Sequence, residues 1–198
     1  MPFRVALTFD AEHPDRPANS DPQAVLDLLD REKVPASFFL QGRWVEAYPR
    51  LARRVADAGH LIGNHSFYHA RMPLLTGAGL RTDVRAAESV IRRRVGVDPR
   101  PWLRLPFGSG ENDPLLATRL DALGYRHIGW DVDVAEWRAR QTSARVADGI
   151  VEGVMSRGDG AIVLLHTWPD PVPGALAVLV PRLRELGVTF VRLDELAA

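Results

Sequence analysis

Two histidines, His65 and His69, stand four residues apart in the stretch GNHSFYH at residues 63–69. Residues with this spacing share one side of a helical turn, so the two imidazoles could bind one cation. The spacing is that of the HExxH zinc helix, but Ser66 stands where that motif has its general-base Glu, which excludes that protease signature. Capping and surface histidines can have the same spacing, so the pattern by itself leaves both interpretations open.

Three further residues that could transfer protons or balance charge follow strand-like runs. Asp10 follows residues 4–9 and could act as a base, although Asp is also a common cap or turn residue. Arg104 opens the stretch RLPFG, where it could hold a nearby carboxylate ionised through a bidentate pair or point outward from a turn. His166 follows residues 162–165 and could be an acid or a structural histidine.

An acidic cluster closed by an indole follows residues 127–130; it contains Asp131, Asp133, Glu136 and Trp137. Carboxylates at this density repel one another unless a cation or a histidine interacts with them, and a solvated loop is the alternative. Five strand-like runs are thus followed by residues that could do chemistry. Because chance explains all five poorly, we expect one shared site.

The elements that must position these residues alternate along the chain. Short β-rich runs cover residues 4–9, 36–40, 60–63, 102–104, 127–130, 162–165 and 188–191. Amphipathic stretches predict helices over residues 21–33, 49–58, 80–95, 114–123, 143–155 and 175–186, the first with Asp21 as its cap. This alternation predicts one α/β domain over residues 1–198 with a parallel sheet, either doubly wound or closed into a barrel. Both arrangements place function at the carboxyl ends of the strands.

Composition limits the functional classes. Basic and acidic residues number 25 each, so no global positive field indicates nucleic acid as a partner. No apolar run approaches the roughly 18 residues of a membrane helix, and the absence of cysteine excludes thiolate metal sites, so a metal would need His and carboxylate ligands. The start, MPFRVALTFD, lacks the features of a signal peptide, so we expect a cytoplasmic protein, or an extracellular one if a leader was trimmed.

Five motifs in order make the chain resemble the polysaccharide deacetylases of the NodB-homology type, carbohydrate esterase family 4. GHLIGNHSFYH at residues 59–69 resembles the family pattern GHxIGNHTxxH, with Ser66 for Thr. RLPFG resembles its RxPxG element and WDVDVAEW its WSxDxxDW element, while TFD at residues 8–10 and LLH at residues 164–166 begin and end the series. The resemblance implies a distorted (β/α)7 barrel, similar to a TIM barrel. It also implies hydrolysis of N-acetyl or O-acetyl groups that depends on one divalent metal ion.

The resemblance assigns the proton-transfer and metal roles as well. Asp10 would be the general base, with Arg104 as its orienting partner, and His166 would be the general acid. His65 and His69 would bind the metal. Zinc is the expected ion by the habit of the family, and imidazole ligands suit cobalt or nickel too.

Substrate contacts implied by the resemblance come from three residues. The backbone amide of Phe107 would help to hold the oxyanion. Trp137 and Leu164 would surround the methyl group of the acetyl moiety.

Two positions depart from the family pattern. The usual first motif is TFDD, in which the second Asp binds the metal, and this chain has Ala11 at that position. Glu12 is the first substitute as third ligand, because a longer side chain could reach from the next position; His13, Asp10 itself or a weakened site are the alternatives. Glu136 replaces the Asp that normally pairs with the acid histidine, and Asp133 could share that role.

We therefore expect a deacetylase of N-acetylated or O-acetylated sugars that acts on a small-molecule or oligosaccharide substrate. The altered TFDAE motif suggests a first alternative, a hydrolase of non-sugar C–N bonds of the allantoinase or cyclic-imidase kind. Ala11 suggests a second alternative, a catalytically impaired relative that binds carbohydrate. The sequence leaves the sugar, its chain length and the oligomeric state open.

Overall fold

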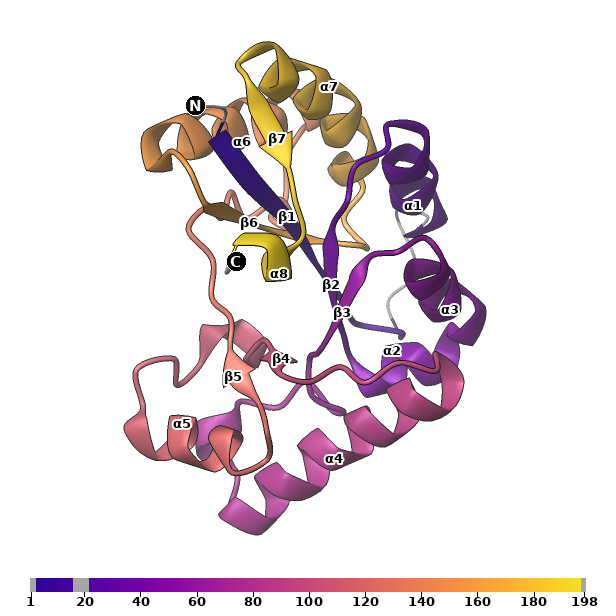
Figure 1. Cartoon of the computed structure of the whole chain (residues 1–198), viewed down its shortest axis with the longest axis vertical. Coiled ribbons are helices and arrows are strands. Elements are labelled where there is room, and N and C mark those ends of the chain that lie inside the picture. The colour runs from indigo at the N-terminus through magenta and orange to yellow at the C-terminus, as the bar shows by residue number, and fades with distance from the viewer. Residues whose placement is uncertain (1–2, 16–21, 197–198) are drawn as a thin grey trace.

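Seven parallel strands form one sheet, shown in Figure 1 from a computed structural model that describes residues 3–15 and 22–196. The strand order is β5-β4-β3-β2-β1-β6, and β7 pairs with β1. The strand bounds are β1 Phe3–Ala11, β2 Ser37–Leu40, β3 Leu61–Asn64, β4 Trp102–Leu103, β5 Arg126–His127, β6 Ala161–His166 and β7 Val188–Phe190. All seven predicted strands are present.

The strands curve into a ring that is closed irregularly. β5 ends at His127, earlier than the predicted Trp130, because the chain then leaves β4 and crosses towards β6. There Val132 forms an isolated parallel bridge with Val163, which returns the ring to its first strands. The expected distorted seven-stranded α/β barrel is therefore confirmed.

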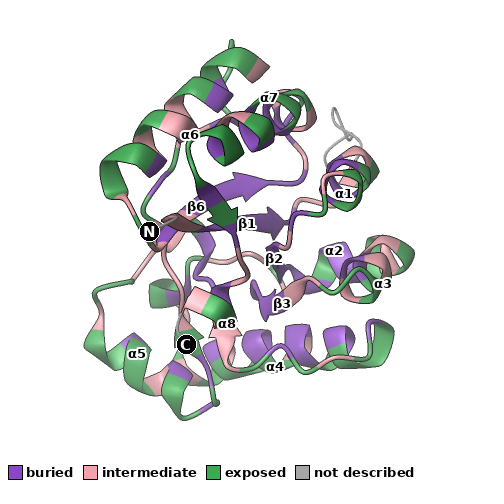
Figure 2. Ribbon diagram, turned by 45° about the horizontal axis from the view of Figure 1, so that its top comes forward, coloured by how far each residue is buried: buried purple, intermediate pink, exposed green. Residues whose placement is uncertain are grey.

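The helices surround this ring and turn their buried faces towards it (Figure 2). Their bounds are α1 Pro22–Arg31, α2 Gly42–Ala47, α3 Pro49–Asp57, α4 Gly77–Arg94, α5 Pro114–Asp121, α6 Ser143–Arg157, α7 Pro171–Glu185 and α8 Leu193–Leu196. The six predicted helices are present, whereas the short helices α2 and α8 were not predicted. The predicted cap Asp21 lies outside the described residues.

Side chains along β1 alternate between two environments because successive residues of a strand point to opposite faces. Val5, Leu7, Phe9 and Ala11 belong to the large apolar core between the strands and the surrounding helices. Ala6 belongs instead to a small cluster with Phe39 and Leu193. Residues of even number on β1 therefore face the interior of the ring, and Asp10 shares that parity.

The amino ends of the strands are plugged by α8. The amide of Leu193 donates a hydrogen bond to Ser37 Oγ at 3.1 Å, at the start of β2. Above this plug the Phe39 ring fills the interior, and Gly63 leaves it room, since a Cβ at that position would come within 2.6 Å of the ring. Open space in the ring is thus left at the carboxyl ends of the strands.

Among the residues that the structure describes, no helix combines the length and the apolar character needed to cross a membrane.

Candidate active site and metal centre

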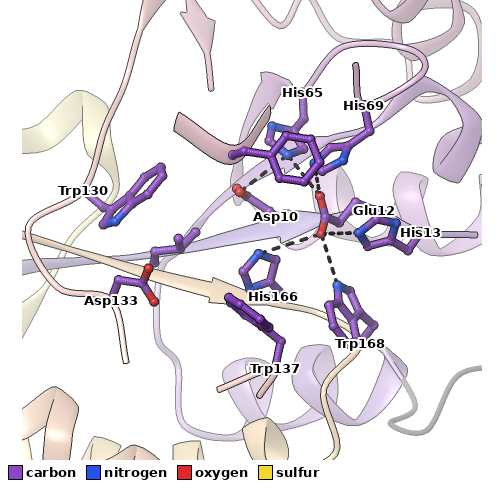
Figure 3. Close-up of a pocket in the computed structure, with 12 residues that line it drawn as sticks. Asp10, Glu12, His13, His65, His69, Trp130, Asp133, Trp137, His166 and Trp168 are labelled. Atoms are coloured by element: carbon purple, nitrogen blue, oxygen red, sulfur yellow. Dashed lines mark hydrogen bonds and ion pairs between the residues drawn. The ribbon is translucent and has the colours of Figure 1, made fainter. Parts of the chain in front are cut away.

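A cavity of about 310 Å³ opens at the carboxyl ends of the strands. Figure 3 shows its carboxylates and imidazoles converging from β1, from the loop after β3 and from β6. The lining residues are Asp10, Glu12, His13, His65, His69, Phe107, Trp130, Asp133, Trp137, Leu164, His166 and Trp168. Nearly all predicted site residues meet here, and the two exceptions, Arg104 and Glu136, lie directly behind lining residues.

Asp10 is held from beneath by Arg104. Arg104 is completely buried, its guanidinium carbon lies 4.2 Å from the centre of the Phe39 ring, and its Nη1 donates to Asp10 Oδ1 at 3.1 Å. The same nitrogen donates to Thr8 Oγ at 2.8 Å. The predicted bidentate pair is wrong, because Arg104 Nε and Nη2 donate instead to the carbonyl oxygens of residues 128 and 129. Arg104 therefore fixes Asp10 through one contact and anchors itself to the barrel wall with the others.

Glu12 lies one step above Asp10 and has the same parity along the chain. Its Oε2 lies 3.3 Å from His65 Nε2 and in close contact with His69 Nε2. Its Oε1 lies 2.9 Å from His13 Nε2 and accepts a hydrogen bond from Trp168 Nε1 at 3.3 Å. Ala11, by contrast, is fully buried in the outer core, so a carboxylate at position 12 is the one that enters the cavity.

His65 and His69 reach the cavity from a tight loop, and the predicted helical turn is wrong. Ser66 and His69 have φ angles of 62° and 59°, in the left-handed region, and the loop follows directly on β3. Ser66 Oγ accepts from the amide of His69 at 2.8 Å. The carboxylate of Asp83, on α4, accepts from the amides of residues 67 and 68, both at 3.0 Å. The loop is thus shaped by side-chain acceptors instead of by a helical hydrogen-bond ladder.

The donor set fits a divalent metal. Glu12, His13 and His69 each offer one ligand atom, and these atoms lie within 4.8 Å of one another. His65 Nε2 also contacts Glu12, and its Nδ1 lies 2.9 Å from the backbone carbonyl of Arg104, a partner that fixes the ring. One carboxylate oxygen and two or more imidazoles are ligands that zinc, cobalt and nickel accept.

The pKa shifts of Glu12 and His69 favour metal binding, whereas that of His65 favours its protonated form while no metal is bound. Although burial would raise it, the hydrogen bonds to His13, His65 and His69 hold the pKa of Glu12 well below its ordinary range. Burial lowers the pKa of His69, which favours the neutral imidazole that a metal needs. For His65, burial is outweighed by the charges of Asp10 and Glu12, so its pKa is raised.

His166 lies on the other side of the cavity, paired with Glu136. Its Nδ1 lies 2.8 Å from Glu136 Oε1, which also accepts from the His166 amide at 2.7 Å. Burial opposes the charge of the imidazolium, but the hydrogen bond to Glu136 and the charges of Glu136, Glu12 and Asp10 raise the pKa of His166 to about 9. The predicted pairing of this histidine with Glu136 is present. Asp133 lines the cavity, and its Oδ1 accepts from the amide of Ala135 at 2.7 Å.

The mouth of the cavity is aromatic. Phe107 is 55% exposed, has a φ of 61° and lies edge-on to His69 with 4.5 Å between ring centres. Trp137 is 46% exposed, whereas Leu164 is buried at the cavity wall. An acetyl group that enters would meet apolar surface on its way to the buried carboxylates.

The model of the polysaccharide deacetylase family matches residues 2–128 of this chain. That range carries the Asp10, His65 and Arg104 motifs and covers more than half of the chain. The chain belongs to the polysaccharide deacetylase family.

Known polysaccharide deacetylases resemble the chain in sequence and in fold. A peptidoglycan-N-acetylglucosamine deacetylase of Bacillus cereus is 30% identical over 198 residues, which span 97% of this chain and 67% of that protein. Bacillus subtilis PdaA, a family 4 carbohydrate esterase, superposes with a TM-score of 0.87 at 28% identity, covering 99% of this chain and 81% of that one. A family 4 acetyl xylan esterase from Clostridium thermocellum, solved with a cobalt ion, has a TM-score of 0.84 at 33% identity and covers 98% and 89%.

This member of the polysaccharide deacetylase family is therefore a carbohydrate deacetylase, a hydrolase whose site fits a divalent metal. The alternative of an impaired relative was suggested by Ala11. The structure removes much of the support for this alternative, because Glu12 places a carboxylate against both histidines of the GNHSFYH motif.

Sequence patterns missed several residues of this deacetylase site. Asp83 gave no signal, because it lies on a helix far along the chain from the loop that it holds. Thr8 looked like an ordinary strand residue, although its even number on β1 puts it inside the ring with Asp10. Trp168 follows His166 by two residues, and Trp130 directly precedes the acidic cluster that begins at Asp131. Their closeness in sequence to predicted site residues could have indicated both.

Proposed function

We propose that the protein removes acetyl groups from the nitrogen of acetylated sugars in oligosaccharides or polysaccharides, with zinc as its metal. One observation carries this proposal. Asp10, backed by Arg104, and His166, backed by Glu136, line the same cavity as the Glu12, His65 and His69 cluster. A base, an acid and a metal site are the components of metal-assisted hydrolysis of an unactivated amide.

Glu12, His65 and His69 would hold the metal, because both of these histidines contact Glu12 Oε2, whereas His13 contacts Oε1. When bound, a divalent metal polarises the acyl carbonyl and lowers the pKa of a water molecule towards roughly 7. Asp10 takes the proton of the attacking water. Its position is set by Arg104, which also balances the negative charge of Asp10 in a buried environment.

His166 then protonates the leaving nitrogen, since an amine cannot depart as its anion. The raised pKa of His166, about 9, keeps the imidazole protonated near neutral pH and ready to donate. Glu136 contacts Nδ1, so Nε2 is the atom that faces the cavity and delivers the proton.

The acetyl group itself would be recognised at the mouth. Leu164 and Trp137 offer apolar surface to the methyl group, and the amide of Phe107 donates to the oxyanion, a contribution on the order of 3 kcal/mol for one such donor. The left-handed φ of Phe107 is consistent with a backbone amide held in a special orientation.

Acetate release tests this proposal. The purified protein is incubated with chitooligosaccharides of increasing length and with small N-acetylated and O-acetylated sugars, before and after treatment with a chelator and after addition of zinc, cobalt or nickel. We expect acetate from at least one N-acetylated oligosaccharide, loss on chelation and best recovery with zinc. Ring opening of a cyclic imide or of allantoin without any acetate release would contradict the proposal.

A further inference from the structure

The two oxygens of Glu12 have different surroundings. Oε2 faces His65 and His69, the pair that the proposed function assigns to the metal. Oε1 faces away from them, towards His13 Nε2 at 2.9 Å and Trp168 Nε1 at 3.3 Å. Figure 3 shows His13 and Trp168 on the same side of the carboxylate.

His13 reaches Glu12 only because the backbone turns sharply. Its φ is 56°, a left-handed value that non-glycine residues adopt rarely, and this angle brings the ring back over the preceding side chain. The turn is held by Gln41, which is buried at the end of β2: its Oε1 accepts from the amide of His13 at 3.0 Å. The amide of Gln41 in turn donates to the carbonyl of Ala11 at 3.0 Å, so both sides of Glu12 are anchored to β2.

Trp168 approaches Glu12 from the segment that follows β6, the strand paired with β1. Its ring lies edge-on to that of His13, with 5.7 Å between ring centres. The two rings therefore support each other and present two N–H groups to one oxygen. Side chains from the segments after β1 and β6 thus meet at Glu12 Oε1, and the end of β2 holds the backbone turn that carries His13. His166 Nε2, at the end of β6, lies farther from the same oxygen, at 3.8 Å.

A glutamate needs such support more than an aspartate would. Glu has one more side-chain torsion, so ordering it costs more conformational entropy. Carboxylates that bind metals are commonly hydrogen-bonded by outer partners, and removal of such a partner typically costs 10–100-fold in metal affinity. A ligand moved from position 11 to the longer side chain at position 12 would lose precision without a clamp.

We infer that His13 and Trp168 are positioning residues that clamp Glu12 Oε1, so that Oε2 alone is presented to the metal. The inference rests on the proposed metal site of Glu12, His65 and His69. In this arrangement His13 holds a ligand and is not a ligand itself.

Cobalt binding to purified variants tests the clamp, with affinity measured by competition with a chromogenic chelator and coordination followed by the visible absorption of Co²⁺. His13→Ala and Trp168→Phe should each weaken Co²⁺ binding by about 10-fold. The position and intensity of the Co²⁺ bands should not change. His13→Gln, which keeps an N–H donor at similar reach, should restore most of the affinity.

His60→Gln is the matched control, because His60 lies at the amino ends of the strands, where its Nδ1 accepts from the amide of Ala36. It should bind Co²⁺ like the wild type. Circular dichroism checks that each variant is folded. If His13→Ala does not fold, Trp168→Phe and His13→Gln decide the question, since Trp168 lies outside the turn and Gln keeps a side chain at position 13 that can reach Glu12.

Two outcomes overturn the inference. If His13→Gln is as weak as His13→Ala and the Co²⁺ bands shift, His13 is a direct ligand. If Trp168→Phe and both His13 variants bind like the wild type, there is no clamp. Failure of the proposed metal site would look different, because the wild type would then bind no Co²⁺ or Glu12→Ala would retain full affinity.

Discussion

The active site has two halves that are built differently. In one half, the proposed proton-transfer groups Asp10 and His166 stand on neighbouring strands and are direct partners in the parallel register of β1 and β6. In the other half, His13, Ser66, His69 and Phe107 all have φ angles between 56° and 62° in loops beyond the strands. The first half is placed by the backbone ladder, and the second by side chains that hold strained loops. Changes in the strand half should therefore affect proton transfer, and changes in the loops that carry His13, His65 and His69 should affect metal binding.

The largest effect is expected from Asp10→Asn. The amide cannot accept the proton of water, and general-base catalysis typically contributes 10²–10⁴-fold, so kcat should fall by that order. Metal content measured by atomic emission should stay near that of the wild type, because Glu12, His65 and His69 are unchanged. Asp121→Asn, an exposed position on α5, is the control for the substitution. If the variant lost metal together with activity, the proposed separation between a proton-transfer half and a metal-binding half would be wrong.

Next comes Glu136→Gln, which removes the charge that holds the proton on His166. A raised pKa means that the imidazolium persists until the pH rises through about 9 in the wild type, so kcat/KM should fall only above that pH. In the variant the basic limb should move towards the ordinary histidine pKa of about 6.5. The measurement is kcat/KM for an N-acetylated sugar as a function of pH. An unchanged basic limb would show that His166 is not the acid or that Glu136 does not set its pKa.

A smaller effect is expected in the loop half from Asp83→Asn. An amide can accept only one of the two backbone N–H bonds at the GNHSFYH loop, so His65 and His69 should be less well placed. We expect the affinity for the metal to fall by about 10-fold, as measured by competition with a chelator. The pH profile at saturating metal should keep the basic limb of the wild type. A shifted limb at full metal occupancy would contradict the separation of the halves.

The smallest effect is expected from Asp133→Asn. The carboxylate of Asp133 accepts from the amide of Ala135, a bond that an asparagine oxygen can keep, while Glu136 is the carboxylate beside His166 Nδ1. kcat/KM and its basic limb should stay near those of the wild type. If the basic limb of kcat/KM moved to a different pH, Asp133 would share with Glu136 the role of setting the pKa of His166.

The strand half could be predicted well from the sequence. Asp10 and His166 follow runs of apolar residues, and strand period and parallel topology together require such residues to meet at one end of the sheet. Arg104 was placed correctly as the partner of Asp10. Its single contact was not predictable, because the competing acceptors are carbonyl groups of a segment beyond β5.

For the loop half, the sequence predicted which residues take part but not the conformation of the loops that carry them. The GNHSFYH spacing suits a helical turn and a tight loop equally, and the choice depends on Asp83 and on local acceptors that spacing does not reveal. Similarly, Glu12 was the first substitute for the missing aspartate, but the partners of its outer oxygen depend on how β1, β2 and β6 meet. Short helices such as α2, with six residues, offer too little periodicity to be recognised.

The central claim is that Glu12 completes the metal site in a chain that has Ala11 at the family's ligand position. A crystal structure with Co²⁺, with the ion located by its anomalous diffraction, tests this claim most directly. We predict one peak bonded to Glu12 Oε2, His65 Nε2 and His69 Nε2. A peak bonded to the two histidines without Glu12 would contradict the account.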